Sequence, residues 1–131
     1  MKMIFSIPAL PVKEMVRSIV FYRDILGFAL VHQDGGFAIF QRDAVEVHLW
    51  EASDESWQTR TTTGIVSGAE SFIAGTASCR IAVEGVDELY RELQPHGIVH
   101  SGAHLDDKPW GTREFGILDC DNNLITFFER H

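Results

Sequence analysis

A pattern that occurs twice in the 131 residues constrains the fold more than any other feature of the sequence. Residues 13–26 carry apolar side chains at helical spacing and are followed by Gly27, a residue typical of a helix C-terminus. Residues 86–93 repeat the pattern and are stopped by Pro95 and Gly97. One strand-like run precedes each helical segment and three follow it. The chain is therefore expected to contain two copies of a βαβββ module.

The expected strands are short runs rich in β-branched and aromatic residues, separated by turn-forming residues. They comprise residues 4–10, 28–33, 37–41, 45–50, 78–83 and 98–101, and a final strand pair around a turn at 119–123. Pro8 cannot donate to a ladder, so it marks an edge, a bulge or a crossing point between subunits. In the final pair, residues alternate with their neighbours as in half-buried strands: Phe115, Ile117, Leu124, Thr126 and Phe128.

We predict an α+β fold in a single domain, with module 1 at about 1–60, a linker at 61–76 and module 2 at 77–131. In each module one helix covers one face of a mixed sheet. The other sheet faces are expected to curve around a common axis and to line a cleft, where ligands usually bind. The apolar stripe of the first helix comprises Val12, Met15, Val16, Ile19 and Leu26, with Tyr22 or Val20 between them.

Residues 51–76 interrupt the periodic pattern. Ser, Thr, Gly and Ala dominate there, with Trp57 and a few apolar residues scattered among them. We expect a long loop with a short helix near 69–73. A loop of this length inside a compact domain is usually functional or mobile.

Composition excludes several classes of function. The net charge of -8 and the pI of about 5.1 argue against nucleic acid and are compatible with a cationic ligand, although solubility alone also accounts for them. No run approaches the ~20 apolar residues of a membrane span, and the N-terminus does not resemble a signal peptide. Cys79 and Cys120 are too few and too far apart for a disulfide framework. We expect a cytoplasmic protein.

Trp110 is the first candidate for a ligand contact, because it lies between Pro109 and Gly111 on a stiffened loop beside a strand. The alternative is that its ring caps the end of the core. Arg113 and Glu114 are expected to form a cross-strand pair. Four histidines show no spacing typical of metal ligands and are expected on the surface or in loops: His32, His96, His100 and His104.

Three motifs resemble the vicinal oxygen chelate superfamily, which holds glyoxalase I, ring-cleaving dioxygenases, fosfomycin-modifying enzymes and bleomycin-resistance proteins. The resemblance covers nearly the whole chain and implies paired βαβββ modules in a homodimer, often with exchange of a strand or module between subunits. The motifs are Val16-x-x-Ile19-x-Phe21-Tyr22-x-x-x-Leu26-Gly27-Phe28, Val86-Asp87-Glu88-Leu89-Tyr90, and Trp110-Gly111-x-Arg113-Glu114-Phe115 with Asp119-x-Asp121-x-Asn123.

The enzymes of this superfamily hold a metal with His, Glu or Gln at four sheet positions. The resemblance places Ile7, His48, Arg80 and Thr126 at these positions. Only His48 is a credible ligand, since Ile7 has no donor, Thr126 is a weak one and Arg80 is permanently positive. Glu46 shares a strand face with His48. We therefore expect no bound metal and no cofactor, and a metal-dependent lyase or dioxygenase stays as the alternative.

The chain resembles the bleomycin-resistance branch most, in residues 34–38 and 109–115. This implies a protein that does no chemistry and sequesters a cationic glycopeptide with flat rings in two grooves at a dimer interface. Phe37 and Trp110 match the stacking positions of that branch. Two features depart from the pattern of that branch. Arg80 is one, since an arginine in the groove opposes a cationic ligand, and the length of the 51–77 segment is the other. An orphan small-molecule binder is the third possibility. Further candidate contacts are Trp50, Trp57, His48, Asp107, Gly111 and Arg113.

Overall fold

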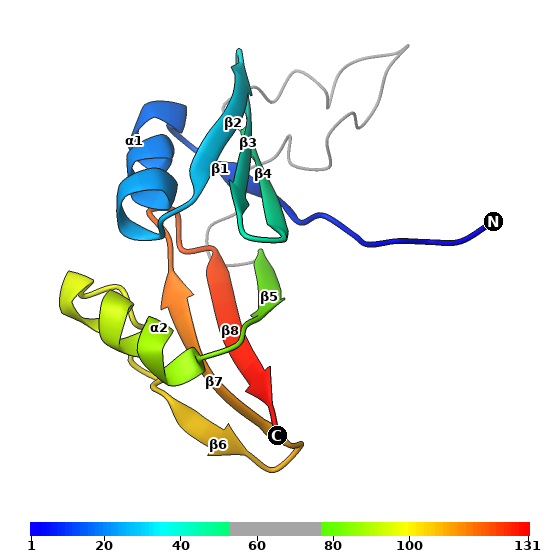
Figure 1. Ribbon diagram of the computed structural model, residues 1–131. Helices are drawn as coiled ribbons and strands as arrows, with labels where there is room; N and C mark the ends of the chain where they lie inside the picture. The colour runs from blue at the N-terminus through cyan, green and yellow to red at the C-terminus, as the bar shows by residue number, and fades with distance from the viewer. Residues whose placement is uncertain (53–76) are drawn as a thin grey trace. The chain divides into compact units, whose positions relative to one another are not determined.

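A computed structural model describes residues 1–52 and 77–131. The chain divides into two compact units, Met1–Phe72 and Ile73–His131, which are described separately below. Each unit contains one four-stranded sheet and its helices (Figure 1). The predicted helix near 69–73 lies outside the described residues, and the predicted module limits stay predictions. Within the described part of the chain, no helix has the length and apolarity needed to cross a membrane.

The first unit has the predicted βαβββ order. Its strands pair in the order β1-β4-β3-β2, with β1 parallel to β4 and the other pairs antiparallel (Figure 1). Alternate side chains of the central strands are buried against the helix, which leaves the other face of the sheet open. The elements are β1 (Ala9–Val12), α1 (Met15–Val20), the π-helix η1 (Phe21–Ile25), β2 (Ala29–Asp34), β3 (Phe37–Arg42) and β4 (Val45–Glu51).

The helix predicted over 13–26 is confirmed from Met15 to Ile25, but its second half forms the wider η1 turn. The backbone N–H of Leu26 donates to the carbonyl of Phe21 at 3.1 Å, an i→i+5 bond. This wider turn lets two adjacent aromatic residues, Phe21 and Tyr22, both enter the core. Val16 is exposed, so its predicted place in the buried stripe is wrong. Of the two alternatives Tyr22 and Val20, Tyr22 is buried and Val20 is exposed. Gly27 ends the helix at φ 74°, as predicted.

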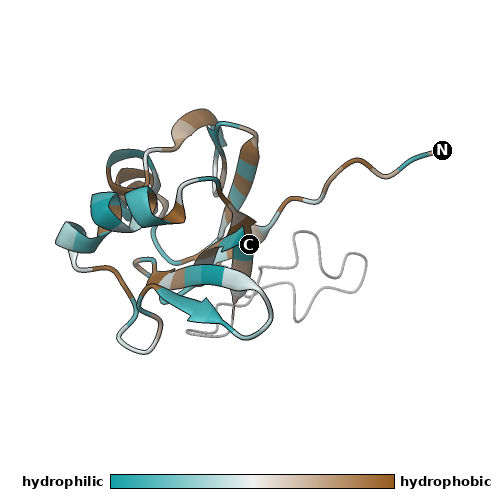
Figure 2. Ribbon diagram, turned by 60° about the horizontal axis from the view of Figure 1, so that its bottom comes forward, coloured by the Kyte–Doolittle hydropathy of each residue, from teal (hydrophilic) through white to brown (hydrophobic). Residues whose placement is uncertain are grey.

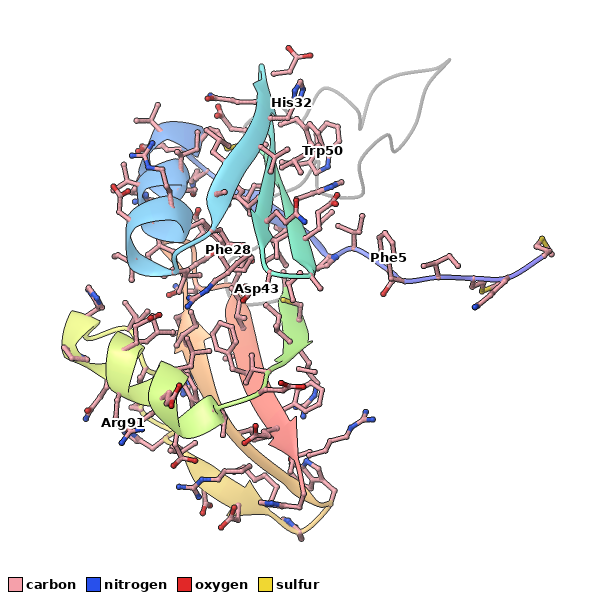
Figure 3. All side chains as sticks on the ribbon, in the orientation of Figure 1. Phe5, Phe28, His32, Asp43, Trp50 and Arg91 are labelled. Atoms are coloured by element: carbon pink, nitrogen blue, oxygen red, sulfur yellow. The ribbon has the colours of Figure 1, made fainter. Side chains whose placement is uncertain are left out.

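The first strand begins later than the predicted 4–10. Ala9 pairs with His48, and this register places Ser6 opposite Val45, the first residue of β4. Residues earlier than Ser6 therefore have no β4 residue to pair with. They extend away from the sheet (Figures 1 and 2), with Phe5 on this segment in Figure 3. The exposed apolar side chains of the segment are Met1, Met3, Ile4 and Phe5.

The second unit repeats the order of the first. Its strands pair as β5-β8-β7-β6, which matches β1-β4-β3-β2 strand for strand and confirms the predicted repeat. Helix α2 has the predicted bounds and packs against β7 and β8. Gly97 follows η3 at φ 69°. The elements are β5 (Ser78–Ala82), α2 (Val86–Leu93), the 3-10 helix η3 (Gln94–His96), β6 (Asp106–Lys108), β7 (Thr112–Leu118) and β8 (Leu124–Arg130).

The strand predicted at 98–101 is wrong. Only Val99 makes a bridge there, to Ile117, and the second strand of the module is instead β6. The chain turns because the N–H of Ala103 donates to the carbonyl of His100, while the His100 ring accepts the N–H of Gly102. These local bonds compete with an extended strand.

The final strand pair exists as predicted, but the face of its second strand is reversed. Phe115 pairs with Phe127, and Ile117 pairs with Ile125, and all four side chains are buried. Three residues predicted to alternate with Phe115 and Ile117 instead share the open face of β8: Leu124, Thr126 and Phe128.

The predicted turn at 119–123 is confirmed. Asn122 adopts φ 62°, and Asp119 Oδ1 accepts the backbone N–H groups of Asp121 and Asn123 at 2.9 Å each. Asn123 also donates its side-chain amide to Asp119 Oδ2 at 2.8 Å. One buried carboxylate thus satisfies three donors of the turn, which fixes the turn's shape.

Candidate ligand-binding surfaces

The open face of the first sheet carries an aromatic cluster, which we define as His32, Phe37, His48 and Trp50. Phe37 and Trp50 are register partners on β3 and β4, and their ring centroids lie 4.5 Å apart. The edge of His48 meets Phe37 at 5.1 Å, and His32 lies 6.3 Å from Phe37 on its other side. Figure 3 shows His32 and Trp50 at the same end of the sheet. Three of these rings are half-buried, His32 is exposed, and together they form a platform suited to a planar ligand.

The backbone around the β2–β3 turn fixes Phe37 in this cluster. Gly35 adopts φ 57° in the predicted hairpin turn. The N–H of Glu51 donates to the carbonyl of Gly36 at 2.7 Å, and a Cβ at Gly36 would lie only 3.2 Å from the Glu51 Cβ. The turn therefore packs closely against the end of β4, and Phe37 follows it directly.

His48 and Glu46 share the open face of β4, as predicted, and their Nε2 and Oε2 atoms lie 2.5 Å apart. Among residues 1–52 and 77–131, no group of three His, Cys, Asp or Glu side chains converges as a metal site would need. Arg80 and Thr126, predicted at two family metal positions, are register partners on the other sheet. The donors at these positions do not fit a metal.

The open face of the second sheet carries an ionic network centred on the buried Glu114. Arg80 donates to both Glu114 carboxylate oxygens, at 2.7 and 3.4 Å. Thr112 Oγ1 donates to Oε2 at 2.7 Å. The Arg80 guanidinium lowers the pKa of Glu114 below its ordinary value, and the Thr112 hydroxyl acts in the same direction. Glu114 is thus held as a carboxylate.

Arg80 reaches Glu114 by crossing the strand that lies between them. Arg80 is on β5 and Glu114 on β7, with β8 in the middle. The Arg80 guanidinium carbon lies 4.7 Å from the centroid of Phe128 on β8, and that of Arg130 lies 5.6 Å from the same ring. The carboxylate of Glu114 thus balances the charge of Arg80, whereas the expected effect of Arg80 on a cationic ligand stays a prediction.

Trp110 lies in the turn between β6 and β7 and is 64% exposed. Within the described part of the second unit, Trp110 therefore does not cap the core. Gly111 adopts φ 90°, and its N–H donates to the carbonyl of Lys108 at 3.1 Å, which closes the turn. The Trp110 side chain is also among the groups that lower the pKa of Glu114. The indole is the largest exposed ring of this unit's described surface.

Arg113 points away from Glu114, so the predicted pair of these two residues is wrong. Its guanidinium contacts Asp87 on α2 at 3.0 Å and Asp107 on β6 at 3.4 Å. Asp107 also meets the His131 ring at 3.2 Å, so this acidic side chain already has two basic partners. Neighbouring residues of a strand face opposite sides, which explains why Arg113 and Glu114 have different partners.

The predicted site residues thus fall into two groups. The first unit brings together Phe37, His48 and Trp50, and the second holds Asp107, Trp110, Gly111 and Arg113. Trp57 lies outside the described residues. Sequence reasoning did not name four residues of the second surface as site residues: Thr112, Glu114, Phe128 and Arg130. The two-residue spacing of Thr112 and Glu114 within β7 is the signal that they share a face.

Cys79 contributes no nucleophile to the second surface. Burial, and secondarily the charge of Asp119, raises the pKa of Cys79 to about 11. A thiol with this pKa is almost fully protonated at neutral pH. Cys79 is therefore a poor nucleophile at that pH.

Known proteins match the chain almost from end to end. A bleomycin resistance protein from Geobacillus stearothermophilus is 55% identical over 129 residues, which is 98% of each chain. A bleomycin resistance protein from Staphylococcus aureus matches equally. The solved structure of a bleomycin-binding protein complexed with bleomycin shares the fold, with a TM-score of 0.72, 21% identity and coverage of 98% of this chain and 100% of that one. A family model matches residues 5–127, and the chain belongs to the glyoxalase/bleomycin resistance protein/dioxygenase superfamily.

Proposed function

We propose that this protein binds an antibiotic of the bleomycin family and sequesters it without chemical change. The observation that carries the proposal is the 55% identity, over 98% of both chains, to relatives that bear the name bleomycin resistance protein. Sequestration requires only a surface complementary to the ligand. Both open sheet faces provide side chains of the required kind.

The aromatic rings supply the contacts that a flat heteroaromatic ligand needs. Phe37 and Trp50 form one paired platform, and Trp110 is an exposed indole on a closed turn. Each favourable ring–ring contact contributes about 0.5–1.5 kcal/mol beyond the burial of area. Two or three such contacts, together with apolar burial, are sufficient for a tight complex.

Charge supports a cationic ligand. The net charge of -8 attracts a cation over distances longer than direct contacts. Asp107 already contacts Arg113 and His131, so we assign the attraction to the protein as a whole rather than to this residue. Arg80 does not oppose a cation strongly, because its charge is balanced by Glu114.

The proposal includes a homodimer in the cytoplasm, with exchange of the N-terminal segment between subunits. Four apolar side chains of residues 1–8 are exposed in the single chain, and Pro8 lies just before β1. A second copy would bury these side chains. Light scattering on the full chain tests this, with a mass near twice 14.7 kDa expected. A single-chain mass at micromolar concentration would contradict it.

Calorimetric titration of chelator-treated protein with copper-loaded bleomycin tests the binding function. We expect about one site per chain and exothermic binding. Metal analysis of the untreated protein accompanies it. Failure to bind would overturn the proposal.

The second candidate is a metal-dependent enzyme of the same superfamily, favoured by the contact between His48 and Glu46, two potential ligands on one sheet face. It predicts stoichiometric nickel, zinc, manganese or iron in the purified protein and loss of that metal in His48→Ala. Titration with bleomycin and metal analysis therefore separate the two candidates.

A further inference from the structure

Glu46 and His48 form a hydrogen-bonded pair beside the aromatic cluster of the first sheet. Val47 and Leu49 of β4 are buried, so the residues that alternate with them share the open face: Glu46, His48 and Trp50. Because a carboxylate can only accept, the Nε2 atom of His48 is the donor to Glu46 Oε2, at 2.5 Å. The two side chains are only 23% and 32% exposed, so water and salt screen their interaction less than that of a fully exposed pair.

The backbone of His48 is held on both sides, which leaves its ring as the part free to turn. The N–H of His48 donates to the carbonyl of Pro8 at 3.0 Å, and the residue pairs with Ile39 on β3. These contacts fix the Cα but not the rotation of the imidazole about its Cβ–Cγ bond, a torsion with broad preferences. The hydrogen bond to Glu46 selects one orientation of the ring.

The orientation of the His48 ring matters because it packs against Phe37. The two ring planes are 89° apart and their centroids lie 5.1 Å apart, which is an edge-to-face contact. Phe37 also contacts its register partner Trp50, with 4.5 Å between the centroids. Phe37 therefore contacts two rings of β4, one directly opposite and one diagonal to it. Rotation of the imidazole would remove one of these two contacts.

We propose that Glu46 is a positioning residue for ligand binding, which fixes the His48 ring against Phe37 and so preorganises the platform of Phe37 and Trp50 for a planar ligand. A ring that is already immobile loses less entropy when a ligand stacks on it. The inference rests on the proposed function for its ligand. The contact between His48 and Phe37 is a property of the free protein and is testable without one.

The experiment compares the full chain with Glu46→Met, which keeps the length of the side chain but removes the acceptor. Nuclear Overhauser effects between the ring protons of His48 and Phe37 are measured in ligand-free, chelator-treated protein, with the signals assigned through His48→Phe and Phe37→Leu. We expect these effects in the wild type and expect them to weaken in Glu46→Met. Affinity for copper-loaded bleomycin should fall by roughly threefold to tenfold, the range of one side-chain hydrogen bond. Glu46→Gln keeps an acceptor oxygen and should retain the ring contact.

A double-mutant cycle shows whether Glu46 acts through His48. His48→Phe keeps a ring but removes the donor, so Glu46→Met should have little further effect on affinity in that background. An undiminished effect there, or an unchanged ring contact in Glu46→Met, would overturn the inference. A ring contact that appears only after zinc or nickel is added would also overturn it, because the pair would then act as metal ligands. If wild-type protein does not bind bleomycin, the proposed function fails, and the ligand-free spectra still decide the role of Glu46.

Asp43→Asn is the matched control. It removes one negative charge from the same hairpin, as Glu46→Met does, but Asp43 lies in the turn between β3 and β4 (Figure 3). Asn tolerates the positive φ of 52° at this position. We expect the control to leave the ring contact and the affinity unchanged, and an equal loss of affinity would assign the effect to net charge instead. Glu46→Thr, which suits a strand and is too short to reach the His48 ring, replaces Glu46→Met if that variant does not fold.

Discussion

The two open sheet faces share a topology and differ in chemistry. On the first sheet, Phe37 and Trp50 face each other across neighbouring strands, with His48 at the edge. On the second, the corresponding surface is organised by an ion pair between Arg80 and Glu114. The repeat therefore specifies the backbone and the buried faces, while the open faces are free to diverge. In the first unit the rings pack against one another, and in the second a carboxylate pairs with a guanidinium.

The largest expected effect tests whether the two cores are equivalent. Phe40 on β3 and Phe115 on β7 are each at most 1% exposed. Replacing either with Ala should lower the free energy of unfolding by about 3–5 kcal/mol, measured by urea denaturation. Val31→Ala on β2 is the exposed control and should change it by less than about 0.5 kcal/mol. A loss below about 1 kcal/mol in one core alone would show that the cores are not equivalent.

The next effect tests the ionic organisation of the second face. Arg80→Met leaves the buried Glu114 carboxylate without its cation and should cost about 1–3 kcal/mol of stability, less than for a fully buried pair because Arg80 is 48% exposed. The double variant Arg80→Met/Glu114→Met removes both charges and should recover much of this loss. Urea denaturation of the four proteins measures the coupling. Additive losses would mean that the pair does not stabilise the face.

A smaller effect separates binding from stability. Trp110→Ala should weaken bleomycin binding by roughly tenfold, about 1.4 kcal/mol, through loss of a stacking contact. Because the ring is exposed, the free energy of unfolding should change by less than about 0.5 kcal/mol. Calorimetry and urea denaturation give the two values. A large loss of stability with unchanged affinity would assign Trp110 to the fold instead.

The smallest expected effect is a pH dependence confined to the second face. The pKa of Glu114 in the folded protein lies below its ordinary value of 4.5, so folding favours the carboxylate. The resulting stability is complete above the unfolded pKa and is lost as the pH falls through the folded pKa. The difference in unfolding free energy between wild type and Glu114→Gln should be constant above about pH 5 and decrease below it. A difference that does not depend on pH would contradict this sign.

Sequence alone predicts the elements that follow local rules. Helix α2 has acidic residues in its first turn and a glycine after its end, and its predicted bounds are correct. The β2–β3 hairpin and the turn at Asp119 follow from turn-forming residues in the same way. The place of Phe37 beside Trp50 follows from strand alternation once the hairpin is known.

The ionic surface was not predictable, because its parts meet only in the assembled sheet. Arg80 and Glu114 are 34 residues apart and lie on strands that are not neighbours. Their contact depends on β8 lying between them with Phe128 under the guanidinium. The η1 turn was missed for a different reason, since a period of 3.6 residues does not anticipate a wider turn.

The η1 turn also bears on insertions and deletions. A π turn holds one residue more than the α-helical turn it replaces. Removing one residue from Phe21–Ile25 would let the helix continue in regular form to Gly27, but only one of two adjacent aromatic rings would then face the sheet. The number of residues in the η1 turn is therefore coupled to the volume of the core. A helix shorter by one residue would need a larger side chain elsewhere in the first unit to fill the space that the displaced ring leaves.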